Sequence, residues 1–201
     1  MSLDSMQLIL ASGSAGRKAM LQNAGLNFTV IPANIDEDKI TKDLLCKNST
    51  PEDITRELAI QKSLSISALQ PDMLVIGSDQ TLVLDGKIFS KAKDTKGAEE
   101  KLKILRGKTH ILNSAVCVCK NNKVLFETLD SAQLKMNNFT NDFLKSYMLS
   151  AKDSLTTCVG AYAIEQTGAW LFTDITGNYF TIMGMPLLPL LTFLQTQGFR
   201  P

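Results

Sequence analysis

The chain has 201 residues, of which 44% are hydrophobic and 20% are charged, as expected of a globular protein with one large core or two small lobes. The formal net charge is +1, so no strong overall field favours nucleic acid or a membrane surface, and any affinity for an anion must be local. No apolar run approaches the ~20 residues of a membrane span, and the N-terminus lacks the pattern of a signal peptide.

The cysteines do not have the paired spacing of a metal site. Cys117 and Cys119 fall in an alternating apolar run, which places both side chains on one face of a strand. We interpret them as free, packed thiols in a reducing cytoplasm, with a redox pair as the alternative. The predicted location is therefore cytoplasmic.

The first seventy residues alternate between strand and helix signals. A strand is predicted over 7–11, a helix over 16–23 that ends at Gly25, and a strand over 28–33 that stops at Pro32. The segment 34–50 is acidic at its start and is predicted to be irregular after that. Thr50 and Pro51 then begin a helix that extends to about residue 69.

The rest of the chain adds longer strands. We predict two strands within 73–89, interrupted at 77–80 and followed by a tight turn at Asp85-Gly86. Helices are predicted over 94–105, 138–149 and 187–198, and two long strands over 110–119 and 123–136, joined at Asn121-Asn122. Because consecutive strands favour antiparallel pairing, the expected fold class is α/β with a mixed sheet.

The opening stretch "LILASGSAGRKAML" runs from a buried strand through small residues into a helix. Such a turn leaves backbone N–H groups uncovered at a helix N-terminus, where an anion can bind. Ser12 and Ser14 add hydroxyl groups, and Arg17 and Lys18 add positive charge, so phosphate is the best-matched anion. The alternative is a capped helix with two solvated cations, and the loop matches neither common mononucleotide motif.

A second polar set, "IGSDQTLV", interrupts an apolar strand. Buried polar groups need partners or a cleft, so Asp79 is the best candidate for a general base or metal ligand, its alternative being a structural aspartate at a strand bend. Glu37 lies in an acidic cluster that could supply carboxylates to Mg²⁺, or only be solvated. His110, the single histidine, is interpreted as structural.

Lys62 falls on the core-side stripe of its helix, and Lys91 follows a strand end. Neither lysine alone indicates a functional site, because lysine side chains often extend along apolar surfaces to reach solvent. Together with Arg17, Glu37 and Asp79, however, they supply cations for phosphates, carboxylates for a divalent ion and a base for water, which is what hydrolysis of a polyphosphate requires.

These residues lie in motifs that resemble the Maf family of nucleoside triphosphate pyrophosphatases. The resemblance runs from Leu8 to Gly198. Besides the opening stretch, the matching blocks, in order, are "DE" at Asp36-Glu37, "LAIQKS", "VIGSDQ", "KIFSKAKD", "LRGKTH", "VGAYAIEQTGAWLF" and "ITGNYFTIMGMPLLPLL".

The resemblance implies cleavage between the α- and β-phosphates of a nucleoside triphosphate, with Mg²⁺ or Mn²⁺ as cofactor. It implies that Asp79 is the proton acceptor and that Glu37, with Asp79, holds the metal. The implied phosphate-binding residues are Ser12, Ser14, Arg17, Lys62 and Lys91. It also implies an elongated, inosine-triphosphatase-like fold in which residues 1–201 form one domain of two lobes around a cleft, and a homodimer.

Three departures from the family pattern bear on the base. Gly16 stands where the family often has arginine or tryptophan, Gln80 where members acting on dTTP and UTP have threonine, and Glu165 where those members have glutamine. Gln80 and Glu165 are similar to the residues of the branch that acts on 7-methyl-GTP. The physical reason for a glutamate there is that its carboxylate accepts from two guanine N–H groups and favours a positively charged base. The resemblance therefore implies 7-methyl-GTP or a dTTP/UTP-type nucleotide as the expected substrate.

The expected activity is removal of non-standard nucleotides, without membrane or stable nucleic acid binding, since the chain lacks a basic aromatic platform. Two alternatives stay open. One is a regulator of cell division that senses nucleotides without catalysis, and the other is a house-cleaning enzyme of the inosine-triphosphate type.

Overall fold

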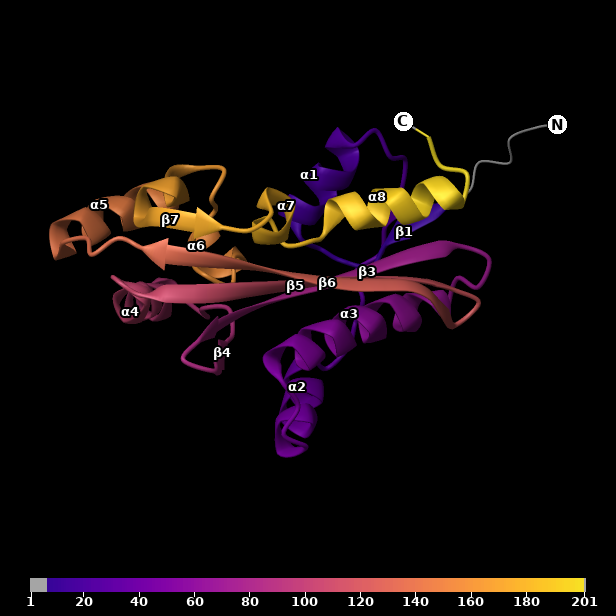
Figure 1. Ribbon diagram of the computed structural model, residues 1–201, viewed down its shortest axis with the longest axis horizontal. Helices are drawn as coiled ribbons and strands as arrows, with labels where there is room; N and C mark the ends of the chain where they lie inside the picture. Colours follow the sequence, from indigo (N-terminus) through magenta and orange to yellow (C-terminus); the bar gives the residue numbers. More distant parts are fainter. Residues whose placement is uncertain (1–6, 201) are drawn as a thin grey trace.

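The computed structural model describes residues 7–200, which form one long mixed sheet with helices on both faces (Figure 1). The strands are β1 (Leu8–Leu10), β2 (Thr29–Val30), β3 (Leu74–Leu84), β4 (Lys87–Phe89), β5 (Thr109–Lys120), β6 (Lys123–Met136) and β7 (Phe172–Thr176). The helices are α1 (Ala15–Asn23), α2 (Glu37–Cys46), α3 (Pro51–Ser67), α4 (Thr95–Leu105), α5 (Asn141–Ala151), α6 (Ser154–Thr157), the 3-10 turn η1 (Thr167–Leu171), α7 (Tyr179–Ile182) and α8 (Leu187–Thr196).

The sheet order is β2-β1-β3-β5-β6-β7, with β4 paired to β3 outside this path. β1 pairs in parallel with both β2 and β3, whereas the remaining pairs are antiparallel. The predicted mixed α/β class is therefore confirmed, and the long strands β3, β5 and β6 give the molecule its elongated shape (Figure 1).

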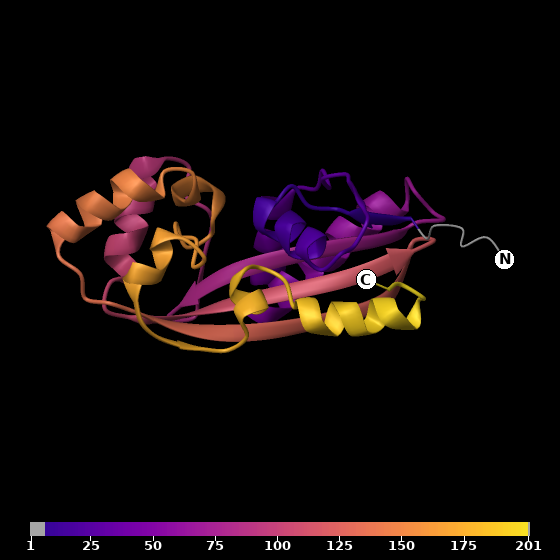
Figure 2. The same cartoon turned by 90° about the horizontal axis from the view of Figure 1, so that it is seen from above.

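Apolar side chains gather in separate clusters along this sheet. One cluster packs α4, α5 and α6 against one end of the long strands and includes Leu102, Leu134 and Leu144. Another packs α1 and α8 against the other end and includes Leu21 and Leu190. Figure 2 shows these two helical groups over opposite ends of the strands.

Several local signals act as predicted. Thr50 and Asp53 form a capping box at the start of α3, and both residues of the Asp85-Gly86 turn have positive φ, as a tight hairpin requires. Asn121 and Asn122 also have positive φ and join β5 to β6. Among residues 7–200, no helix combines the length and hydrophobicity needed to cross a bilayer.

Three predicted elements are wrong or shifted. Residues 37–46 form a helix, not an irregular segment, because the Asp36 side chain caps it by accepting from the Lys39 N–H at 2.9 Å. The strand expected over 28–33 shrinks to Thr29–Val30, because β1 offers only three residues for pairing. The helix expected from residue 138 begins at Asn141, where Thr140 supplies the cap.

The interruption expected at residues 77–80 is also absent, and β3 is continuous. Its ladder with β5 pairs every residue from Val75 to Val83. The polar side chains are accommodated because each finds partners on one or the other face of the strand. Because the strand is continuous, successive side chains of residues 77–80 point to opposite faces of the sheet.

Candidate active site at the centre of strand β3

Asp79 and Lys62 form a buried ion pair where α3 crosses β3. The Lys62 Nζ lies 2.5 Å from Asp79 Oδ1, and the two residues are 7% and 6% exposed. Odd-numbered residues of β3 face α3, as the contact between the Thr55 and Thr81 hydroxyls also shows. The helical stripe that the sequence predicted for Lys62 therefore brings this lysine onto the candidate base.

Glu37 joins this pair from the start of α2. Its Oε1 lies 2.9 Å from Lys62 Nζ, and its side chain is half exposed. One ammonium thus bridges two carboxylates from different elements. The helix that the sequence analysis missed is the element that presents Glu37 to Lys62.

Arg17 is the second buried cation, and it lies in the first turn of α1. Its Nη1 donates to Ser12 Oγ at 3.0 Å, and its Nε donates to the Gly184 carbonyl at 2.9 Å. Ser14 caps α1 by accepting from the Arg17 N–H at 3.4 Å. These side-chain contacts use two of the five guanidinium donors, so others remain for a ligand.

Electrostatics connect the two cations to the two carboxylates. Burial raises the pKa of Asp79, and the nearby Lys62 and Arg17 charges oppose that rise. Burial likewise lowers the pKa of Arg17, and Asp79 and Glu37 oppose that change. The Arg17 charge therefore acts on both carboxylates, while its own hydrogen bonds, among the described residues, go to Ser12 and Gly184.

Gln80 points to the opposite side of β3 from Asp79. Its Nε2 donates to Ser114 Oγ at 3.1 Å and to the carbonyls of Thr181 and Ile182, both at 3.0 Å. Its donors thus hold α7 against the sheet. The motif of Gln80 implies a residue that reads the base and gives no sign of this contact with α7.

Gly184 is a part of the site that sequence reasoning did not single out. Its carbonyl accepts from Ser78 Oγ at 3.1 Å as well as from Arg17, and its φ is +110°. A Cβ on this residue would lie 3.7 Å from both Arg17 Nε and Gln80 Oε1. The only available signal was the glycine in the closing motif "TIMGMP".

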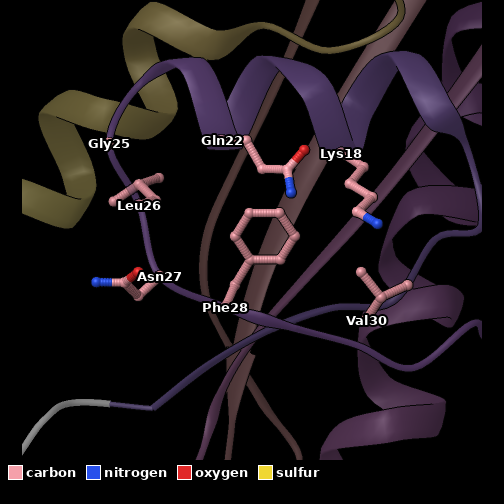
Figure 3. Close-up of a pocket in the computed structure, with 7 residues that line it drawn as sticks. All are labelled: Lys18, Gln22, Gly25, Leu26, Asn27, Phe28 and Val30. Carbon is pink, nitrogen blue, oxygen red and sulfur yellow. The ribbon is translucent and has the colours of Figure 1, made fainter.

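Gly16 and Lys18 occupy other faces of α1. A Cβ on Gly16 would lie 3.5 Å from the Met183 carbonyl, beside the segment that ends at Gly184. Lys18 is exposed and lines a separate open pocket with Gln22, Phe28 and Val30 (Figure 3). Of the two adjacent cations, only Arg17 therefore belongs to the buried cluster.

Lys91 and Glu165 form a second group around Cys158. Both are exposed. Burial raises the pKa of the Cys158 thiol, its hydrogen bond with Thr157 lowers it, the Glu165 charge raises it and the Lys91 charge lowers it, so both charges act on the same thiol. Neither residue has a polar contact with Lys62 or Asp79 among the described side chains.

The carboxylates of Glu37 and Asp79 are the residues that could hold a divalent cation. Mg²⁺ commonly binds one or two protein carboxylates and completes its shell with water and substrate phosphates. Both carboxylates contact one ammonium, so they converge on one point. The donor set fits such an ion, although residues 7–200 contain no cluster of three or more potential metal ligands.

The remaining titratable candidates are structural. His110 is fully buried, contacts the Tyr162 hydroxyl at 2.6 Å, and has its pKa lowered to about 4 by burial. Cys117 and Cys119 are buried free thiols on one strand face, with their sulfurs 3.6 Å apart, as predicted. None of them lies in the cluster around Asp79.

Comparison with known proteins agrees with the motif order. The family described as Maf-like protein matches residues 7–197. A protein of Nitrobacter hamburgensis named nucleoside triphosphate pyrophosphatase is 43% identical over 95% of this chain and 94% of its own length. A Brucella abortus protein named 7-methyl-GTP pyrophosphatase is 41% identical over 96% of each chain.

Among solved structures, a HAM1 protein from Coxiella burnetii shares 16% identity with this chain. The alignment covers 67% of this chain and 74% of that one, with a TM-score of 0.45.

Proposed function

This chain belongs to the Maf-like protein family, and from that premise we propose that it hydrolyses a nucleoside triphosphate to the monophosphate and pyrophosphate. The observation that carries the proposal is the buried Lys62–Asp79 ion pair, which Glu37 joins from the surface, with the buried Arg17 close enough for its charge to act on both carboxylates. Two buried cations suit a polyphosphate, and a buried carboxylate beside them suits proton abstraction. Relatives named nucleoside triphosphate pyrophosphatase, such as the Nitrobacter protein, support the same reaction.

In this proposal Arg17 and the loop before α1 hold the phosphates. Arg17 keeps guanidinium donors beyond those used by Ser12 and Gly184, and Ser12 and Ser14 place hydroxyls at the same loop. Lys62 exchanges its contact with Asp79 for a phosphate oxygen when substrate binds. Lys91 approaches the phosphates from the group around Cys158.

Asp79 is the proposed general base. It takes a proton from the water whose oxygen attacks phosphorus, while the bridge between the α- and β-phosphates breaks and pyrophosphate leaves. Burial raises the pKa of Asp79 and so makes it a stronger base than an exposed aspartate. When Lys62 moves to phosphate, the carboxylate becomes free to accept the proton.

We propose Glu37 and Asp79 as ligands of Mg²⁺ or Mn²⁺, which would neutralise phosphate charge and lower the pKa of a bound water. Glu37 is half exposed and Asp79 is buried, so a metal–nucleotide complex would approach from the Glu37 side.

For the base, we propose 7-methyl-GTP, with dTTP or UTP as the other candidates. The exposed Glu165 carboxylate has the acceptors for a guanine edge, and relatives such as the Brucella protein are named for 7-methyl-GTP. Gln80 would act on specificity through α7, because its donors are engaged there. Gly16 would leave space, rather than a stacking surface, beside Met183.

The same proposal includes a single domain of two lobes around a cleft, a homodimer, a cytoplasmic location and a role in removing non-standard nucleotides. The separate apolar clusters at the two ends of the sheet support the two lobes. Residues 1–6 and 201 of that domain lie outside the described residues.

The test is a nucleotide panel with Mg²⁺ or Mn²⁺ that includes 7-methyl-GTP, dTTP, UTP and dITP, with pyrophosphate and orthophosphate measured separately. Asp79→Asn should lower kcat by about 10²–10⁴-fold, whereas Asp174→Asn, an exposed control on β7, should not. Orthophosphate as the product would contradict the cleavage site. Binding without turnover of any nucleotide would favour a nucleotide-sensing regulator, and preference for dITP would favour the inosine-triphosphate type.

A further inference from the structure

Lys101 is a buried lysine outside the cluster around Asp79. It is 7% exposed and lies on the core side of α4, in register with the buried residues Ala98, Leu102 and Leu105. None of the ion pairs among residues 7–200 includes it. A charged group at such a position is unfavourable unless strong hydrogen bonds compensate it.

The Lys101 ammonium donates to two carbonyls from distant parts of the chain. One belongs to Ser90 and the other, at 2.8 Å, to Val159. Ser90 directly precedes Lys91, and Val159 directly follows Cys158. Lys101 therefore joins the segment that carries Lys91 to the segment that leads to Glu165.

The Val159 segment is already held firmly by other contacts. The Tyr147 hydroxyl donates to the Ala161 carbonyl at 3.0 Å, and the Tyr162 hydroxyl contacts His110. The Ser90 segment, in contrast, is exposed at Ser90 and Lys91. Lys101 thus attaches an exposed segment to a fixed one, with Cys158 and its two neighbouring charges at the junction.

We propose that Lys101 is a positioning residue that sets the placement of Lys91 relative to Glu165 and thereby the binding of the nucleotide. This inference rests on the proposed function, because it assigns Lys91 to phosphate and Glu165 to the base. Burial lowers the pKa of Lys101 to about 8, which agrees with an ammonium held by carbonyl dipoles without a carboxylate.

Two variants separate hydrogen bonding from packing. Lys101→Met fills the same apolar surroundings without donors, whereas Lys101→Gln keeps two N–H donors without charge. Lys103→Met is the control, since Lys103 lies on the same helix but pairs at the surface with Glu99. Lys101→Met should raise KM for the best nucleotide about tenfold with kcat within about twofold, and Lys101→Gln should recover part of this loss.

A double variant tests whether Lys101 acts through Lys91. If it does, Lys91→Ala combined with Lys101→Met should have the KM of Lys91→Ala alone. Fully additive effects, equal losses for the Gln and Met variants, or an unchanged KM in Lys101→Met would each overturn the inference.

Amide hydrogen exchange gives a readout that does not depend on activity. Lys101→Met should accelerate exchange in residues 89–93 about tenfold relative to Lys103→Met, because the segment loses its anchor. Equal rates in the two variants would overturn the positioning role. Absence of pyrophosphate release by the unaltered protein would instead refute the proposed function, and exchange would still decide the role of Lys101.

Discussion

α3 packs directly onto the backbone of β3 at Gly77, two residues before Asp79 on the same face. A Cβ on Gly77 would lie 2.3 Å from the Ala59 carbonyl oxygen and 2.5 Å from the Ser63 nitrogen. Both are backbone atoms of a helix and cannot rotate away. Lys62, which pairs with Asp79, lies between these two helical residues.

The Gly77→Ala variant should therefore push α3 away from the strand. A Cβ essentially never comes closer than 3.0 Å to another heavy atom, so the helix backbone must move by about 0.7 Å. Overpacking against a rigid neighbour costs about 3 kcal/mol, and for a chain of this size the melting temperature should fall by about 6–12 °C. Because the shift moves Lys62 away from the position in which it would bind phosphate beside Asp79, kcat/KM should also fall by about 10–100-fold.

Thermal and urea unfolding followed by circular dichroism would measure the stability loss, and pyrophosphate release would measure the activity loss. Gly97→Ala is the matched control, because its Cβ would meet only ordinary contacts, the nearest at 3.4 Å, within α4. That variant should be as stable as the original protein or slightly more so. A Gly77→Ala protein with the same melting temperature as the Gly97→Ala control would refute the close packing of α3 on β3.

Three further outcomes are expected. Burial lowers the pKa of His110 to about 4 in the folded protein, so the neutral imidazole stabilises the fold fully above the unfolded pKa of about 6.5, and this stability is lost as the pH falls toward 4. Between pH 7 and 4.5 the free energy of unfolding should fall by about 2–3 kcal/mol from this group. His110→Gln should flatten the dependence of unfolding free energy on pH in that range. Thr50→Ala breaks the capping box of α3 and should lower the free energy of unfolding by about 1 kcal/mol in urea titrations, while an unchanged midpoint would argue against the cap. Glu165→Gln should weaken turnover of 7-methyl-GTP far more than that of UTP, and equal losses on the two nucleotides would remove its role in reading guanine.

The sequence by itself determined the features whose causes lie within a few residues. The capping box at Thr50, the positive-φ turn at Asp85-Gly86 and the alternation around Cys117 and Cys119 were each readable, because caps, turns and strand faces depend on neighbours along the chain. The resemblance implied that Lys62 and Asp79 serve one site, but not that their side chains pair, and the helical stripe was the one local sign that Lys62 faces inward.

Tertiary structure alone decided how the polar residues of β3 are used. The strand runs unbroken because Gly77 and Asp79 meet α3 while Ser78 and Gln80 meet the segment around Gly184, which is 106 residues from Ser78 and 167 from Arg17. No local rule specifies partners at that separation, since they depend on which surfaces the folded chain brings together. For the same reason the role of Lys101 could not be predicted, because its ammonium donates to the carbonyls of Ser90 and Val159, which are 11 and 58 residues away in the chain.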